Sequence, residues 1–496
     1  MSFFPENEAI LFIPGLANLE MNQTVEAFAY RLKKSLDINS PEENDKFITE
    51  LRKTTYGKDN KQECQIVSIY RISNNEKKKV YDIYELNYCR DLIRRFEQMN
   101  VLFKTMVLFT TVTAKLPRFF WVIIRRTKGL HLRDKIQSLY VGLILLSISL
   151  YGIMLLTALV ASIEQPLANQ NWGSLNLGNA IQTEKQTISA ILHTYFGSFS
   201  LLPAAQEVFS WIGNVLLHIY RFFADIFLLL WQIPLMVFHV ALTFRDWIIG
   251  SAAILFLLLP NIRTFITNTA TQYICYFNYL NVGERRLNII GKLEEILECA
   301  SESKENYSKI SIHSFSFGSI VALDALFPYD GVISERMKNI HTLITVGCPY
   351  DFIRVYWPNY YNRQKLAENK PLQLQRWYNV YSSIDILSSN FRDDSSQKEA
   401  EKMIGAQKPT NVPFNAITPE DVSTWDNFTL LGLRAHTLYW EDESYSASYL
   451  TNLFQQMKKD EEKANREQIV QENARTTFDL TVSTAALVDE VALAKT

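Results

Sequence analysis

The chain has 496 residues, of which 21% are charged, and a formal net charge of −2. This balance excludes the strong basic field that gathers nucleic acid. The 5 cysteines form no C-x-x-C pair, and no Cys/His cluster has the spacing of metal ligands, so we expect neither a metal nor a cofactor. The length suggests two or three domains.

The composition changes along the chain and divides it into four parts. Residues 1–95 and 266–455 have the mixed composition of a soluble domain, residues 96–265 are dominated by apolar runs, and residues 456–496 form a polar tail. We interpret 1–95 and 266–455 as two parts of one domain. A membrane-associated helical insert at 96–265 would then separate them.

The first part predicts several strands and one helix. A continuous apolar run over 9–13 indicates a buried strand, which Pro14 and Gly15 end. A helical segment follows at 23–36, and two further strands are expected at 64–71 and 80–86, with a turn between them.

Residues 136–163 carry the clearest membrane signal. The run is uncharged and long enough to cross a bilayer with some tilt. Its C-terminal flank, out to about residue 192, carries only Lys185 as a basic residue. Its N-terminal flank carries Arg125, Arg126, Lys128, Arg133 and Lys135. By the positive-inside rule, the N-terminal side is cytoplasmic.

A second apolar region covers 208–262. A soluble domain built from both flanks of the insert requires an even number of crossings, so we expect one crossing within 222–262. Arg263, Arg285 and Arg286 then follow on the cytoplasmic side. The alternative is that 208–262 forms a buried lid or a pair of core helices.

The segment 309–326 carries the strongest chemical pattern. Its first half alternates and is β-branched, as in a strand, and its second half has apolar residues at helical spacing. Ser316 falls at the turn between them, with the small residues Ser314 and Gly318 two positions away on either side. A nucleophilic serine requires this strained strand-turn-helix geometry. Ser314 is the alternative nucleophile, although Gly318 then has the wrong offset.

Residues 313–319 resemble the His-Ser-Leu-Gly-Ser stretch of lipase-like α/β hydrolases. The usual nucleophile motif has glycine two residues before the serine, and this chain has Ser314 at that position. The resemblance implies an α/β fold with a mostly parallel sheet flanked by helices. It also implies a chain order of serine, acid and histidine. It does not cover the helical transmembrane insert that interrupts this fold, which resembles no family that we recognise.

The resemblance assigns the base and the acid. Residues 435–440 resemble the His-x-x-Tyr-Trp ending of the same enzymes, which makes His436 the base. His341 precedes a strand at 343–347 and is expected away from the site. The stretch 376–387 resembles a strand followed by the acid, which favours Asp385. Asp351, in a turn that resembles the Gly-x-Pro turn of some families, is the alternative acid.

The oxyanion hole is expected from two backbone N–H groups. One belongs to Phe317, directly after the nucleophile. The other belongs to Leu16, because the loop at 12–16 resembles the His-Gly element of the superfamily, with Pro14 in place of histidine.

These expectations describe a membrane-anchored serine hydrolase that cleaves a carboxylic ester through a Ser316–His436–Asp385 triad. Membrane lipids are the expected substrate and surroundings, because an insert between core strands commonly caps the site in this fold. An acyltransferase, a thioesterase and a non-catalytic membrane scaffold are the alternatives. We expect an integral membrane protein whose catalytic domain is cytoplasmic, and the bacterial inner membrane is favoured because no eukaryotic targeting signal is seen.

Overall fold

The computed structural model describes the two soluble-looking parts of the chain. The described residues are 7–16, 23–40, 45–57, 62–74, 76–89, 91–92, 272–328, 333–357, 374–391, 408–414, 435–436, 438–440 and 448–467, with single residues at 107, 110, 142, 360 and 470. The chain forms two compact units. The first comprises Met1–Asn100, Thr110–Leu145 and Asn268–Thr496, and the second comprises Val101–Phe109 and Leu146–Thr267.

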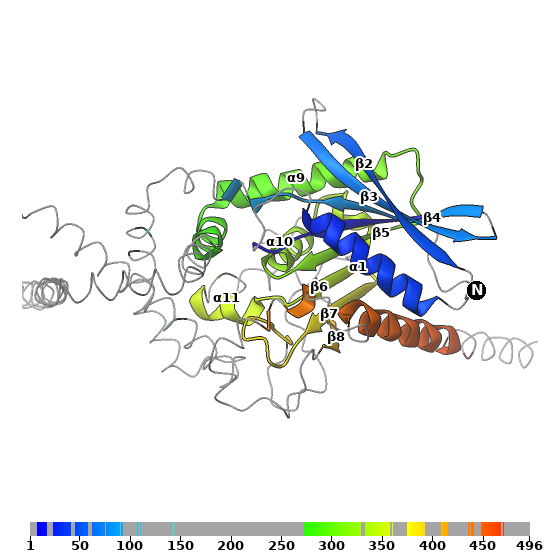
Figure 1. The fold of residues 1–496 in the computed structure, drawn as a ribbon. Helices are drawn as coiled ribbons and strands as arrows, with labels where there is room; N and C mark the ends of the chain where they lie inside the picture. The colour runs from blue at the N-terminus through cyan, green and yellow to red at the C-terminus, as the bar shows by residue number, and fades with distance from the viewer. Residues whose placement is uncertain are drawn as a thin grey trace, which may run out of the picture. The chain divides into compact units, whose positions relative to one another are not determined.

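The first unit is organised around a mixed eight-stranded sheet with the order β2-β3-β4-β1-β5-β6-β7-β8 (Figure 1). The strands β2, β3 and β4 pair antiparallel, and every other neighbouring pair is parallel. Their bounds are β1 Glu8–Ile13, β2 Lys46–Tyr56, β3 Gln62–Ser73, β4 Glu76–Glu85, β5 Lys309–Phe315, β6 Ile340–Val346, β7 Arg376–Tyr381 and β8 Thr410–Pro413. The sheet is therefore mostly parallel, and the fold is of the α/β type.

The central strands are apolar because both of their faces are covered. Ile10 and Phe12 of β1 pack into a core with α1 (Gln23–Asn39) and the helical residues 449–467. Leu11 and Ile13 point to the other face and are also buried. There α10 (Phe317–Leu326) contacts β1, β5 and α9 (Gly283–Ser301). Such two-sided burial is typical of parallel sheets.

Shorter helices complete the described part of this unit. They are α11 (Tyr350–Tyr356) and the 3-10 turns Met337–Asn339 and Leu438–Trp440. Residues 272–281 are also helical and lead into α9. The strands β1 and β5 lie side by side although almost 300 residues separate them in sequence (Figure 1). This pairing brings the loop after β1 next to the turn after β5.

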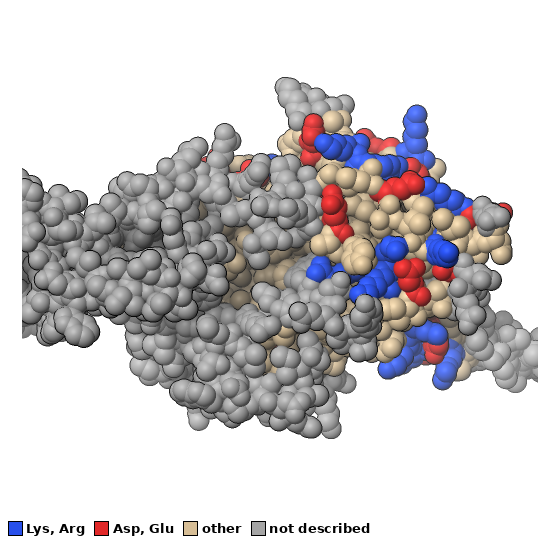
Figure 2. All heavy atoms as spheres, in the orientation of Figure 1, with Lys and Arg blue, Asp and Glu red and all other residues tan. Residues whose placement is uncertain are grey.

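Charged side chains of both signs share the described surface. Figure 2 shows lysine, arginine and acidic side chains interspersed on the visible face. Some of them reach a buried acid: Asp82 is 0% exposed, and its carboxylate lies 2.7 Å from Arg52 Nη2 and 3.2 Å from Lys79 Nζ, which also lies 2.7 Å from Glu305 Oε2. This mixture agrees with the near-zero net charge.

The expected membrane crossings fall outside the part of the chain that the structure describes. This applies to 136–163, apart from Gly142, and to 222–262. Among the described residues, no helix combines the length and the apolar character that a membrane span requires.

Candidate active site

The candidate nucleophile Ser316 is the single residue between the end of β5 and the start of α10. Its backbone has φ 51° and ψ −123°, a region that residues other than glycine rarely adopt. Its N–H donates to the carbonyl of Val346 at 2.7 Å, which ties the turn to the end of β6. Such a strained turn at a strand end is the backbone geometry of a nucleophile elbow.

The elbow packs closely against the end of β1. A Cβ on Gly318 would lie 2.3 Å from the carbonyl oxygen of Ile13 and 2.6 Å from that of Pro14, so only glycine fits there. A Cβ on Gly15 would lie 3.0 Å from Cβ of Ser316. The small residues around the serine therefore bring the loop after β1 into contact with the elbow.

Ser314, which replaces the glycine of the usual pattern, is buried and points away from this contact. Its hydroxyl donates to the carbonyl of Ile344 at 2.9 Å. The serine therefore forms a bond to the neighbouring strand β6. This explains how the elbow accommodates a side chain two residues before Ser316.

Ser316, His436 and Asp385 form one hydrogen-bonded chain. His436 Nε2 lies 2.7 Å from Ser316 Oγ, and His436 Nδ1 lies 2.8 Å from Asp385 Oδ2. The carboxylate of Asp385 can only accept hydrogen bonds, so the imidazole proton of His436 lies on Nδ1. Nε2 then carries no proton and can accept the proton of the serine hydroxyl. The three residues predicted as a triad thus lie together with the geometry of nucleophile, base and orienting acid.

The surroundings of Asp385 fix its carboxylate. The side chain is 1% exposed, Oδ1 accepts from the N–H of Leu387 at 2.9 Å, and Oδ2 also accepts from the hydroxyl of Tyr439 at 3.1 Å. That hydroxyl accepts in turn from the N–H of Ser382 at 2.8 Å. The N–H of Leu387, the hydroxyl of Tyr439 and Nδ1–H of His436 therefore offset the cost of burying the carboxylate.

Asp351, the alternative acid, lies in a different network. Its carboxylate accepts from the hydroxyl of Ser389, and its Oδ1 lies 3.5 Å from Arg354 Nη1. Its own N–H donates to Ser389 Oγ at 2.7 Å. The structure thus places Asp385, and not Asp351, in contact with His436.

The imidazole of His436 is closely packed on two sides. The ring of Phe315 stacks on it with centroids 5.5 Å apart and an interplanar angle of 25°. On another side, Gly347 has φ +59°, and a Cβ there would lie 3.2 Å from His436 Cε1. A side chain at position 347 would displace the ring.

The two residues expected to form the oxyanion hole each lie next to a residue of the elbow contact. Phe317 is the first residue of α10, where an amide has no carbonyl one turn earlier in the helix. Leu16 is buried and follows Gly15, which touches Ser316. Both predicted residues therefore flank the elbow.

The sequence did not predict one further residue of the site, Tyr276. Its side chain comes from the helical residues 272–281, and its ring packs edge to face on Phe317, with ring centroids 4.4 Å apart. Burial raises the pKa of Tyr276. No motif surrounds this tyrosine, so only its place in the fold reveals it.

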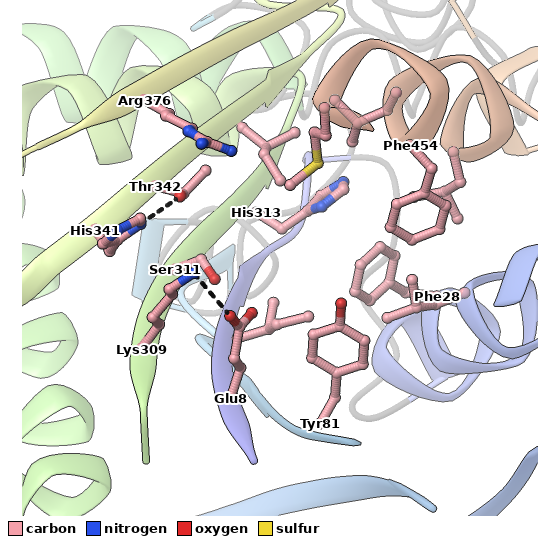
Figure 3. A pocket seen from close by; sticks show the side chains of 16 residues that line it. Glu8, Phe28, Tyr81, Lys309, Ser311, His313, His341, Thr342, Arg376 and Phe454 are labelled. Atoms are coloured by element: carbon pink, nitrogen blue, oxygen red, sulfur yellow. Dashed lines mark hydrogen bonds and ion pairs between the residues drawn. The ribbon is translucent and has the colours of Figure 1, made fainter. Parts of the chain in front are cut away.

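The other histidines near the sheet lie away from Ser316. His341 is the second residue of β6, at the end opposite to Val346. It lines a cavity with Glu8, Lys309 and His313, where the parallel strands begin (Figure 3). His313 hydrogen-bonds Tyr449 Oη at 3.0 Å, and burial lowers its pKa to about 3. The imidazole of His313 therefore stays neutral and has a structural role in the core.

The arrangement can activate a hydroxyl nucleophile with an oriented imidazole base. Among the described residues, no group of acidic, histidine and cysteine side chains could hold a metal ion. Comparison of the chain with protein-family models, with curated proteins and with solved structures finds no match.

Proposed function

We propose that this chain is a serine hydrolase of the α/β-hydrolase type that cleaves a carboxylic ester. The observation that carries the proposal is the hydrogen-bonded series Asp385–His436–Ser316, with distances of 2.8 and 2.7 Å and with the serine at a turn of φ 51°. A structural serine has no need of this strain together with an oriented imidazole.

The proposed reaction has two halves. Ser316 Oγ attacks the ester carbonyl carbon while His436 Nε2 takes its proton, and the carbonyl electron pair moves to the oxygen. The tetrahedral adduct collapses to an acyl-serine, and His436 gives the proton to the departing alkoxide. A water molecule then repeats these steps on the acyl-serine and releases the acid. Asp385 stabilises the imidazolium in both halves.

A lipid ester is the proposed substrate class. Its support is the sequence of the insert, where 136–163 and much of 222–262 are uncharged and suited to a bilayer. An insert that anchors the domain in a membrane would give the site direct access to acyl chains. The proposal therefore includes an integral membrane protein with its catalytic domain on the cytoplasmic side.

Turnover of a total lipid extract by the full-length chain tests this function. We expect release of free fatty acid by the wild type and its loss in Ser316→Ala. Ser314→Ala is the matched control, because that hydroxyl bonds Ile344 and not His436. Fatty-acid release that survives in Ser316→Ala would overturn the proposal. Transfer of the acyl group to an added alcohol or thiol, in place of hydrolysis, would indicate an acyltransferase.

A further inference from the structure

Tyr439 connects the segment that carries the base to the strand end that carries the acid. It lies in the 3-10 turn Leu438–Trp440, three residues after His436, and it is 3% exposed. Its hydroxyl and His436 Nδ1 lie 3.1 and 2.8 Å from the same oxygen of Asp385, Oδ2. The hydroxyl also lies 2.8 Å from the backbone nitrogen of Ser382, which directly follows β7. One short segment of the chain therefore binds the acid with two side chains.

The direction of both hydrogen bonds of the phenol is fixed. A backbone N–H can only donate, so Tyr439 Oη accepts from Ser382. A carboxylate can only accept, so the single phenolic proton points to Asp385 Oδ2. Burial raises the pKa of Tyr439 well above its usual range, so the phenol keeps this proton through the neutral range. Tyr439 is thus a permanent donor to the oxygen that also accepts the Nδ1 proton of His436.

The ring of Tyr439 is packed against the same residues as the imidazole. It lies edge to face on Phe315, with centroids 5.9 Å apart and an interplanar angle of 71°, and Phe315 itself stacks on His436. Phe414 lies against the tyrosine ring at 5.5 Å. A Cβ on Gly347, the glycine that borders His436, would lie 3.1 Å from Tyr439 Cε2. This shared packing fixes the phenol and the imidazole relative to each other.

We propose that Tyr439 is a positioning residue of the catalytic base, acting on His436 through the carboxylate of Asp385. This inference rests on the proposed ester hydrolysis. The phenol binds Oδ2 and the N–H of Leu387 binds Oδ1, so the carboxylate is held beside Nδ1 at both of its oxygens. His436 then keeps the orientation in which Nε2 faces Ser316 Oγ, which proton transfer requires.

The phenol also sets how strongly the carboxylate attracts the imidazole proton. A hydrogen bond to Oδ2 offsets part of the negative charge of Asp385, so less of that charge acts on His436. Without the phenolic hydroxyl, the carboxylate would stabilise the imidazolium more strongly, and the base would become protonated at a higher pH. Tyr439 transfers no proton itself, so the proton balance of the reaction is unchanged.

The other titratable side chains around the base do not compete with Asp385. Burial raises the pKa of the Cys348 thiol and the pKa of the Tyr276 phenol, so both groups stay neutral. Asp351 is paired with Arg354, whose Nη1 lies 3.5 Å from its Oδ1. Among the described residues, Asp385 is thus the one charged side chain that hydrogen-bonds the base.

Tyr439→Phe removes the hydroxyl and keeps the ring. Tyr449→Phe is the matched control, because Tyr449 is 1% exposed, its hydroxyl bonds His313 at 3.0 Å, and its ring lies 6.3 Å from that of Tyr439. Both variants lose one buried hydroxyl and some stability, but only Tyr439→Phe loses a contact with the triad. The measurement is kcat and KM of the full-length chain on a soluble p-nitrophenyl ester as a function of pH, normalised to the folded fraction.

We expect Tyr439→Phe to lower kcat at least about tenfold and to leave KM within about twofold, because the hydroxyl is directed at the acid. The midpoint of the acid limb of the kcat/KM profile should rise by about 0.5 pH units or more. Tyr449→Phe should keep kcat within about twofold of the wild type, with the same midpoint. A merely structural role of Tyr439 would not move the midpoint.

A double substitution tests whether Tyr439 acts through Asp385. In the Asp385→Asn background, Tyr439→Phe should change kcat by less than about twofold, because the carboxylate that the phenol holds is gone. An unchanged kcat or midpoint in Tyr439→Phe, or a full multiplicative loss in the double variant, would overturn the role of Tyr439 while the proposed function stands. A wild type that turns over no ester would overturn the proposed function, and this inference with it.

Discussion

Asp385→Asn is the substitution that most sharply separates the two candidate acids. The carboxylate of Asp385 accepts the Nδ1 proton of His436 at 2.8 Å. An amide at this position can turn its NH₂ towards Nδ1, which places the imidazole proton on Nε2, where it blocks proton transfer from Ser316. We expect kcat to fall about 10⁴-fold, equal to about 5 kcal/mol of transition-state stabilisation.

Asp351→Asn is the comparison variant, because Asp351 follows β6, the strand next to β7 in the sheet. Asp351 is buried with Ser389 and Arg354, so its neutralisation should lower the free energy of unfolding by about 1–3 kcal/mol. Its carboxylate does not contact His436, so ester turnover by the folded fraction should stay within about threefold of the wild type. The assay is kcat on a soluble p-nitrophenyl ester, with urea unfolding of each variant as the measure of stability.

Two results would contradict the roles given to Asp385 and Asp351. Turnover by Asp385→Asn within about tenfold of the wild type would mean that the Asp385–His436 bond does not orient the base. A loss of turnover in Asp351→Asn as large as that in Asp385→Asn, with an unchanged unfolding midpoint, would assign the acid to the other strand end.

Two further substitutions probe the surroundings of the site, and a third probes Glu8 at the opposite end of β1. Gly347→Ala forces an alanine into φ +59° beside His436, and we expect a stability loss of about 1–2 kcal/mol by urea unfolding and a fall in kcat of up to about 10²-fold. Tyr439→Phe removes a donor to Asp385 and should lower stability by about 1–3 kcal/mol, and an unchanged unfolding midpoint would contradict the hydrogen-bond network. Burial raises the pKa of Glu8 from 4.5 to about 7, so its contribution to stability is fully present below about pH 4.5 and lost as the pH rises through 7. The glutamine of Glu8→Gln does not titrate. The free energy of unfolding of this variant should therefore exceed that of the wild type by at most about 3 kcal/mol at pH 8 and by little at pH 5. Equal free energies of unfolding at pH 8 would contradict this.

The elements with strong periodicity were predictable from the sequence. The apolar run at 9–13 is β1, the helical pattern at 23–36 is α1, and the expected strands at 64–71 and 80–86 are parts of β3 and β4. The edge strand β2 was missed because most of its side chains are polar or charged, and 6 of its 11 residues are exposed. The strand β8 has 4 residues, too few to show a period.

The candidate site was predictable where a local pattern marks it. The strand, turn and helix around Ser316 lie within one short segment, so the elbow could be recognised. The choice between Asp385 and Asp351 needed the tertiary structure, because each follows a parallel strand and only the distance to His436 distinguishes them. Tyr276 lies in a helix that precedes the elbow by about 40 residues, and nothing in its neighbourhood of the sequence marks it.

The role of Ser316 as the nucleophile is best tested by mass-spectrometric mapping of the residue that a fluorophosphonate labels in the full-length chain. The probe reacts with a serine hydroxyl only where a base activates it. We expect a single labelled peptide with the adduct on Ser316, and no adduct in the Ser316→Ala variant. An adduct on Ser314 or on any other serine, or no adduct in a wild type with an intact fold, would contradict it.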